Sequence, residues 1–179
     1  MDHSARPADD VWIHPCVEVR RSGVAGEGLF ATTRLDADVV VIRLGGRLVS
    51  TAELHHLFAA AADGDYIDTV AVGDDTHIVL PPGTAAHYGN HSCEPNMWSG
   101  GAYELVTRRP VDPGDELTID YGTISDDAAF RMECTCGAAS CRGVITGLDW
   151  RRADLQRRYA HHWPPGLRRR IDSSAGPSE

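Results

Sequence analysis

The sequence contains no lysine, so all 17 of its cationic side chains are arginine. A reaction that uses a lysine nucleophile or a lysine Schiff base is therefore excluded. The chain also lacks long apolar runs, the longest being Val39–Ile42 and the alanine-rich Leu57–Ala62. Both are far shorter than the roughly 20 residues that a membrane-spanning helix needs, so we expect no contact with a membrane.

A secretory signal is missing as well, because the first residues, MDHSARPADD, include no apolar core. We therefore expect a protein of the cytoplasm, or of the nucleus if its source is eukaryotic. In such a reducing compartment the five cysteines are not expected to form a disulfide framework. Metal binding or catalysis is the function that this leaves for them.

A length of 179 residues with 42% hydrophobic and 24% charged residues is typical of one globular domain with tails. The net charge of -9 is uneven: residues 1–149 carry 10 arginines against 23 acids, and residues 150–179 carry 7 against 3. An acidic body suits a basic protein or peptide partner and repels nucleic acid, so no direct nucleic-acid binding is expected. The alternative is an acidic surface that only keeps the protein soluble.

Short apolar runs separated by glycine predict a mainly β protein built from small sheets. Runs of this length that are rich in Val, Ile and Thr are typical of strands. They are Val17–Arg21, Gly28–Thr32, Val39–Leu44, Arg47–Val49, Thr69–Val72, Thr76–Leu80, Met97–Val106 and Glu116–Tyr121. Turn residues at Gly73–Asp75 and Pro113–Glu116 fit connections beside these strands.

Two helices are expected among the strands. Ser50 and Glu53 fit a capping box, and apolar residues at helical spacing follow over Leu54–Ala61, which predicts a helix with a core-facing stripe. A second helix is expected from Asp149, as its cap, to about His162. Pro164–Gly166 would end it.

Three of the five cysteines, Cys134, Cys136 and Cys141, form a tight Cys-x-Cys-x4-Cys cluster that predicts a zinc site. A structural zinc ion normally has four protein ligands, so one more is expected from elsewhere in the chain. Spacing alone leaves open whether this ligand is Cys93, Cys16 or a histidine. The alternative for the cluster is a set of buried or regulatory thiols without a metal.

The segment Asn90–Asn96, NHSCEPN, concentrates amide, imidazole, hydroxyl and thiol groups. A cysteine nucleophile would pair Cys93 with His91. We disfavour this pair, because catalytic Cys and His usually come from separate parts of a chain and meet only in space. We also expect the two side chains to point to opposite faces of an extended segment.

Three motifs in this order, GEGLFAT at Gly26–Thr32, NHSCEPN at Asn90–Asn96 and ELTIDYG at Glu116–Gly122, resemble the SET-domain protein lysine methyltransferases. The cluster CTCGAASCRG at Cys134–Gly143 resembles the post-SET zinc segment of that family. The resemblance implies a SET-type fold of small sheets with knot-like threading, one inserted helix and a C-terminal helix. It also implies methyl transfer from S-adenosylmethionine to a lysine side-chain amine in a basic protein or peptide substrate.

Residue by residue, the resemblance implies three sets of site residues. Tyr121 would be catalytic, its hydroxyl orienting the substrate amine, while Asp120 would shape the loop. Cys93 would be the fourth ligand of one structural zinc ion, leaving Cys16 as a buried bystander. The residues expected to bind the cofactor, several of them through the backbone, are Glu27, Gly28, Leu29, Tyr66, Asn90 and His91.

Three positions depart from the family pattern. His87 and Tyr88 stand where an arginine and a phenylalanine commonly precede the Asn-His pair, and Ile119 stands where relatives often carry an aromatic residue in the lysine channel. These departures motivate a second hypothesis, a zinc-stabilised SET-like module that binds peptides without turnover. They also leave the number of methyl groups per lysine open.

The expected organisation has five parts. They are a flexible N-terminal arm (residues 1–16), a SET domain (17–124), a post-SET zinc segment (125–148), a C-terminal helical extension (149–170) and a disordered tail (171–179).

Overall fold

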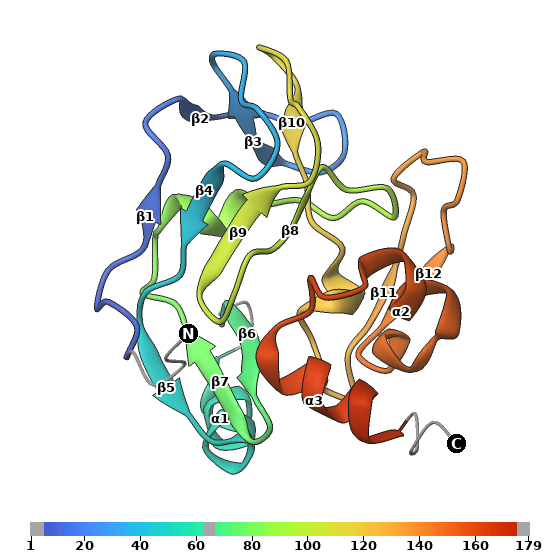
Figure 1. Cartoon of the computed structure of the whole chain (residues 1–179). Coiled ribbons are helices and arrows are strands. Elements are labelled where there is room, and N and C mark those ends of the chain that lie inside the picture. Colours follow the sequence, from blue (N-terminus) through green and yellow to red (C-terminus); the bar gives the residue numbers. More distant parts are fainter. Residues whose placement is uncertain (1–5, 63–66, 175–179) are drawn as a thin grey trace.

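Short strands of two to five residues make up most of the regular structure, as the glycine-separated runs predict. The computed structural model describes residues 6–62 and 67–174, and this part of the chain contains four small antiparallel sheets. Figure 1 shows three of the sheets arranged one above another, with the orange and red C-terminal part packed beside them. The expected mainly β, SET-like architecture of small sheets is confirmed; the knot-like threading stays a prediction.

The middle sheet has four strands in the order β1, β4, β9, β8. Their bounds are Trp12–Ile13 (β1), Val40–Arg43 (β4), Glu104–Thr107 (β9) and Met97–Ser99 (β8). Val41, Ile42 and Met97 are at most 2% exposed and belong to the main hydrophobic core. The run Met97–Val106, expected as one strand, is a hairpin, because Ser99 and Gly100 close a turn back to Glu104.

The expected flexible arm is not loose throughout. Ala8 bridges Gly45, β1 pairs with β4, and the Arg43 guanidinium lies 4.6 Å from the centre of the Trp12 ring. Gly45 has no room for a side chain, since a Cβ there would lie 2.0 Å from the Asp10 carbonyl oxygen. Backbone pairing and this close approach therefore fix residues 8–13 against the sheet, and residues 1–5 lie outside the described part.

The other sheets flank the middle one in Figure 1. One holds β10, β3 and β2, a second holds β5, β7 and β6, and a hairpin of β11 and β12 carries the cysteine cluster. The bounds are Val17–Arg21 (β2), Glu27–Ala31 (β3), Arg47–Val49 (β5), Thr69–Gly73 (β6), Thr76–Val79 (β7), Glu116–Leu117 (β10), Arg131–Glu133 (β11) and Val144–Thr146 (β12).

Helix α1 (Thr51–Ala60) begins where the capping box predicts, because the Ser50 side chain accepts a hydrogen bond from the Glu53 N–H. Its apolar stripe is only partly core. Leu54 is 2% exposed, whereas Phe58 is 39% exposed, and both line a cavity rather than a close-packed interior.

The expected C-terminal helix is present as α2 (Ala153–Tyr159), within the predicted range, but its predicted bounds are wrong. A 3-10 turn (Asp149–Arg151) precedes α2, and a further helix, α3 (Pro165–Ser174), follows it. Asp149 cannot cap α2 because its carboxylate binds Arg142 and Thr146, and the extended Arg152 precedes α2 instead. The expected stop begins α3, since a proline fits the first helical position, where its missing N–H costs nothing.

Two further 3-10 turns, Ala85–Tyr88 and Tyr121–Thr123, lie at the NHSCEPN and ELTIDYG motifs. Among the described residues, none of the helices has the length and apolar character of a membrane span. α3 extends through residues 171–174, which were expected to be disordered, and residues 175–179 lie outside the described part. α3 packs on β6, where Gly166 meets the backbone of Gly73.

A side chain at Gly166 would separate α3 from β6, because a Cβ there would lie 2.3 Å from the Gly73 carbonyl. We expect Gly166→Ala to lower the free energy of unfolding by about 1–3 kcal/mol, the usual cost of overpacking. Gly101→Ala is the matched control, since nothing lies within 4 Å of its added Cβ. Thermal and urea denaturation measure both, and equal stability of the two variants would contradict this packing.

Candidate functional site

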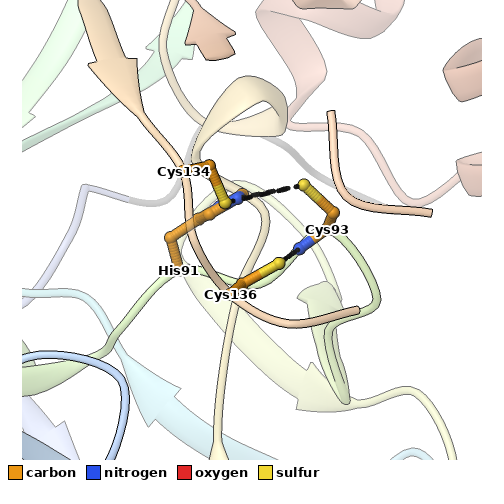
Figure 2. Close-up of side chains that lie close together, drawn as sticks. All are labelled: His91, Cys93, Cys134 and Cys136. Carbon is orange, nitrogen blue, oxygen red and sulfur yellow. Dashed lines mark hydrogen bonds between the residues drawn. The ribbon is translucent and has the colours of Figure 1, made fainter. Parts of the chain in front are cut away.

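Four cysteine sulfurs gather where the segment around Cys93 meets the loop between β11 and β12. The Cys93 and Cys134 sulfurs are 3.9 Å apart, and the Cys134 and Cys141 sulfurs are 3.7 Å apart. The Cys93 N–H points at the Cys136 sulfur at 3.4 Å, as Figure 2 shows. The structure thus brings Cys93 to the three-cysteine cluster.

The loop that carries the cluster folds through local turns. Gly137 and Gly143 have φ values of 72° and 71°, the left-handed region that favours glycine. The Cys134 N–H donates to the Gly143 carbonyl at 2.8 Å and closes the loop at the base of the hairpin. This explains why two glycines flank Cys141.

The ionisation of the thiols suits a cation. Burial raises the pKa of Cys134 to about 12. Burial also raises the pKa of Cys136, but hydrogen bonds from the Cys93 and Ala138 backbones outweigh it and bring the value to about 7. Buried thiols of this kind lose their protons when a metal ion binds, because the positive charge of the ion stabilises the thiolates in place of water.

His91 is a fifth candidate ligand, because its side chain, Cys93, Cys134 and Cys136 have ligand atoms within 4.8 Å of one another. Its Nδ1, however, accepts the Tyr121 N–H at 3.1 Å. Burial lowers the pKa of His91, so the neutral ring carries its single proton on Nε2. A protonated Nε2 cannot bind a metal, and the four cysteines fit zinc better than a set with His91.

The expectation that His91 and Cys93 point to opposite faces is wrong. The Nε2 and the sulfur are 3.4 Å apart, since residues two positions apart in an extended segment share a face. The pair still makes a poor nucleophile, because Cys93 is fully buried and its sulfur also accepts the Arg142 N–H. Cys16 lies apart from the cluster and is half-buried rather than buried.

Asn90 joins the glycine loop to the NHSC segment. Its amide nitrogen donates to the carbonyls of Ala25 and Glu27 at 3.1 and 2.9 Å and contacts the Glu116 carboxylate at 2.7 Å. The loop beside it is open, since a Cβ on Gly26 would meet nothing within 4 Å. Residues 25–27 are exposed beside Asn90, so a cofactor could lie against this loop.

The other expected cofactor residues occupy different settings. A side chain at Gly28 would displace the Glu116 carboxylate, because a Cβ there would lie 2.2 Å from it. Leu29 lies in the central strand β3, in register with Val19 and Leu117, and its side chain is fully buried. Tyr66 lies outside the described residues.

Tyr121 stands at one wall of a cavity of about 330 Å³. Its hydroxyl donates to the Gly89 carbonyl at 2.9 Å, and its ring lies 5.3 Å from that of His91. Ile119 lines the same cavity, and its backbone forms an isolated parallel β-bridge with that of His91. The lining of the cavity also includes His87 and Gly89, just before the NHSCEPN segment, and residues 124–127, which follow the 3-10 turn of Tyr121.

The walls of the cavity carry three carboxylates, Asp68, Asp126 and Asp127. His87, the first departure from the family pattern, faces Asp68 with 2.9 Å between its Nδ1 and the carboxylate. Burial raises the pKa of Asp68, although His87 lowers it in part. Asp126 is paired with Arg170 at 2.8 Å, so Asp127 carries most of the preference of this cavity for a cationic side chain.

A buried network behind Tyr121 was not predicted, except that Asp120 shapes its loop by accepting the Gly122 N–H at 3.0 Å. Arg142 donates to both oxygens of the Asp120 carboxylate at 2.7 and 2.5 Å and to Asp149 at 3.1 Å. The Tyr159 hydroxyl donates to Asp120 at 2.8 Å. Two features of the sequence are compatible with it: Arg142 directly follows Cys141, and Asp120 directly precedes Tyr121.

The ligand set makes a specific prediction for metal content. Cys141→Ser should lose zinc, because one of four thiolates is removed, whereas His91→Gln and Cys16→Ser should keep one ion per chain. Metal analysis of the dialysed proteins by mass spectrometry measures this. Zinc retained by Cys141→Ser but lost by His91→Gln would instead make His91 the fourth ligand.

Comparison with known proteins agrees with this arrangement. The model of the family described as SET domain matches residues 26–122, more than half of the chain. Histone-lysine N-methyltransferase 2B of Homo sapiens is 36% identical over 141 residues, which cover 72% of this chain and 5% of that protein. Histone-lysine N-methyltransferase ATX2 of Arabidopsis thaliana is 35% identical over 144 residues, with 72% and 13% covered.

The chain thus spans only a small part of the length of these relatives. Among solved structures, the methyltransferase domain of human histone-lysine N-methyltransferase SETMAR has a TM-score of 0.59 at 20% identity, covering 72% of this chain and 57% of that chain. This likeness concerns the fold. Together with the family match, it shows that the chain belongs to the SET domain family.

Proposed function

We propose that the chain transfers methyl groups from S-adenosylmethionine to the side-chain amine of lysine in a basic protein substrate. The observation that carries the proposal is the position of Tyr121 and the Gly89 carbonyl on the wall of an acidic cavity, next to Asn90 and the open glycine loop. In this proposal residues 17–124 are the catalytic domain, 125–148 the zinc segment and the helices after residue 149 an extension.

The energetic demand of the reaction is moderate. A lysine amine has a pKa of about 10.4, so removing its proton at pH 7 costs roughly 4.6 kcal/mol, the equivalent of about 3.4 pKa units. S-adenosylmethionine supplies the methyl group, and its sulfonium charge favours loss of the proton from a neighbouring ammonium. Burial of the amine in the cavity adds to this effect, so no metal ion is required for the step.

Tyr121 would orient the amine. Because its hydroxyl donates its proton to the Gly89 carbonyl, its oxygen would act as a hydrogen-bond acceptor toward an N–H of the substrate. The Gly89 carbonyl is a second acceptor at the same place. Two acceptors with fixed positions direct the amine lone pair along one line, and alignment of this kind supplies a large part of the rate.

The zinc ion would be structural, held by Cys93, Cys134, Cys136 and Cys141. Four thiolates leave no open position for chemistry. Its contribution would be to hold the residues after β11 beside the cavity that Tyr121 lines. Such a site needs reduced thiols, which suits the cytoplasm, or the nucleus in a eukaryote.

Replacing Tyr121 by Phe tests the catalytic role. We expect the rate of methyl transfer to fall by about 100-fold, because one fixed acceptor for the amine is lost. Incubation with methyl-labelled cofactor and lysine-rich protein measures it, with Tyr103→Phe as the matched control outside the cavity. Label incorporation by Tyr121→Phe at the wild-type rate would contradict the assignment.

The second hypothesis, a peptide-binding module without turnover, differs in cofactor binding. Calorimetric titration of the wild type with S-adenosylmethionine should give a heat of binding if the proposal holds, and Tyr121→Phe should keep it. A module that binds only peptide gives none. The acidic cavity is common to both hypotheses and does not separate them.

The charge of the cavity predicts a preference among substrates. Asp127→Asn should raise the KM for a lysine peptide with flanking arginines by about twofold to fivefold, the effect of one partly exposed charge pair. The KM for a peptide with neutral flanks should rise by less, because its lysine is then the one cation that meets the carboxylate. Asp36→Asn removes the same charge far from the cavity and is the control, and equal effects of both variants on both peptides would exclude local recognition.

A further inference from the structure

The carboxylate directly before the catalytic tyrosine is completely buried. Asp120 is 0% exposed, and it accepts hydrogen bonds from Arg142, Gly122 and Tyr159. A buried carboxylate is costly unless such donors satisfy both of its oxygens. The position of the Tyr121 backbone therefore depends on where these donors stand.

One of the donors comes from the C-terminal extension, beyond residues 26–122 that match the family model. Tyr159 is the last residue of α2 and is 1% exposed, and its ring meets Trp163 edge-on at 5.6 Å. Burial raises the pKa of Tyr159, so its hydroxyl keeps the proton that it donates to Asp120. A fixed ring and a fixed proton make Tyr159 a rigid donor.

The neighbouring residue of α2 contacts the second motif of the site. Arg158 donates from Nη1 to the Cys93 carbonyl at 2.9 Å. Cys93 follows Asn90 and His91, and the Nδ1 of His91 accepts the Tyr121 N–H. Two adjacent residues at the end of α2 therefore hold both segments that frame the catalytic tyrosine.

We propose that Tyr159 is a positioning residue for the methyl-transfer reaction, acting on Tyr121 through Asp120. This inference rests on the proposed function. The carboxylate of Asp120 holds the 3-10 turn of Tyr121 by accepting the Gly122 N–H. Without the Tyr159 hydroxyl, Asp120 keeps only Arg142 and Gly122, its carboxylate can turn, and the turn that aims the Tyr121 hydroxyl loosens.

The alternative is that the extension only covers apolar surface. Trp163, Leu155 and Leu167 pack with Tyr159 in a separate hydrophobic cluster, which by itself stabilises the extension. A covering role depends on the volume of these side chains, whereas a positioning role depends on the single hydroxyl of Tyr159. Variants that change one without the other distinguish them.

Tyr159→Phe keeps the ring and removes the hydroxyl. We expect its kcat to fall about tenfold, since loss of alignment at a distance is enough to slow an oriented reaction. The KM for the peptide should stay within about twofold, and the affinity for S-adenosylmethionine and the zinc content should be those of the wild type. Leu167→Val disturbs the apolar cluster without touching Asp120 or the edge-on contact between Tyr159 and Trp163, and its kcat should be that of the wild type even if its Tm falls. An unchanged kcat in Tyr159→Phe, or an equal loss in Leu167→Val, would overturn the inference.

A measurement without turnover keeps this test independent of the proposed function. Amide hydrogen exchange followed by NMR reports on the Gly122 N–H, which is bonded to Asp120. The exchange of the Gly122 N–H should be faster in Tyr159→Phe and unchanged in Leu167→Val. If the wild type transfers no methyl group, the proposed function fails while this result still decides whether Tyr159 fixes the turn. Equal protection of Gly122 in the wild type and Tyr159→Phe would contradict the positioning role.

Discussion

The buried ion pair between Asp120 and Arg142 connects the parts of this molecule that lie far apart in the sequence. Arg142 follows the last cysteine of the zinc segment, and its guanidinium binds both Asp120 and Asp149. Asp120 precedes Tyr121, and Asp149 begins the extension. Breaking a buried pair of this kind by removing one partner is strongly destabilising, because an uncompensated charge remains. The ion pairs of Arg142 therefore connect the candidate site, the cysteine cluster and the extension.

Polar contacts explain how Tyr121 is held in place in a chain of small sheets, although few strands lie near it. The sheets bury the apolar core, but Tyr121, the proposed catalytic residue, lies on a 3-10 turn whose position is set by hydrogen bonds with Asp120, His91 and Gly89. The His91 imidazole lies between Tyr121 and Cys93 and contacts both. A structural zinc ion at Cys93 would thus also fix the ring that positions Tyr121.

Much of the fold could be predicted from short-range patterns. Strands such as Arg47–Val49, the Ser50 cap and the turn at Gly73–Asp75 depend on neighbours in the sequence, which the sequence displays. The bounds of the C-terminal helices could not, because Asp149 was assigned to a cap, whereas its carboxylate binds Arg142, a contact that the spacing of the two residues does not reveal. The approach of Cys93 to the other cysteines came from resemblance, since spacing left three alternatives. The partnership of His87 with Asp68 joins residues whose spacing carries no signal.

A structure of the protein with S-adenosylhomocysteine and a lysine peptide would test directly whether Tyr121 orients the substrate amine. We expect the cofactor product to lie against residues 25–27 and Asn90, and the lysine side chain to enter the cavity with its amine at the Tyr121 hydroxyl and the Gly89 carbonyl. A lysine bound on the outer surface, with Tyr121 remote from its amine, would exclude this role of Tyr121.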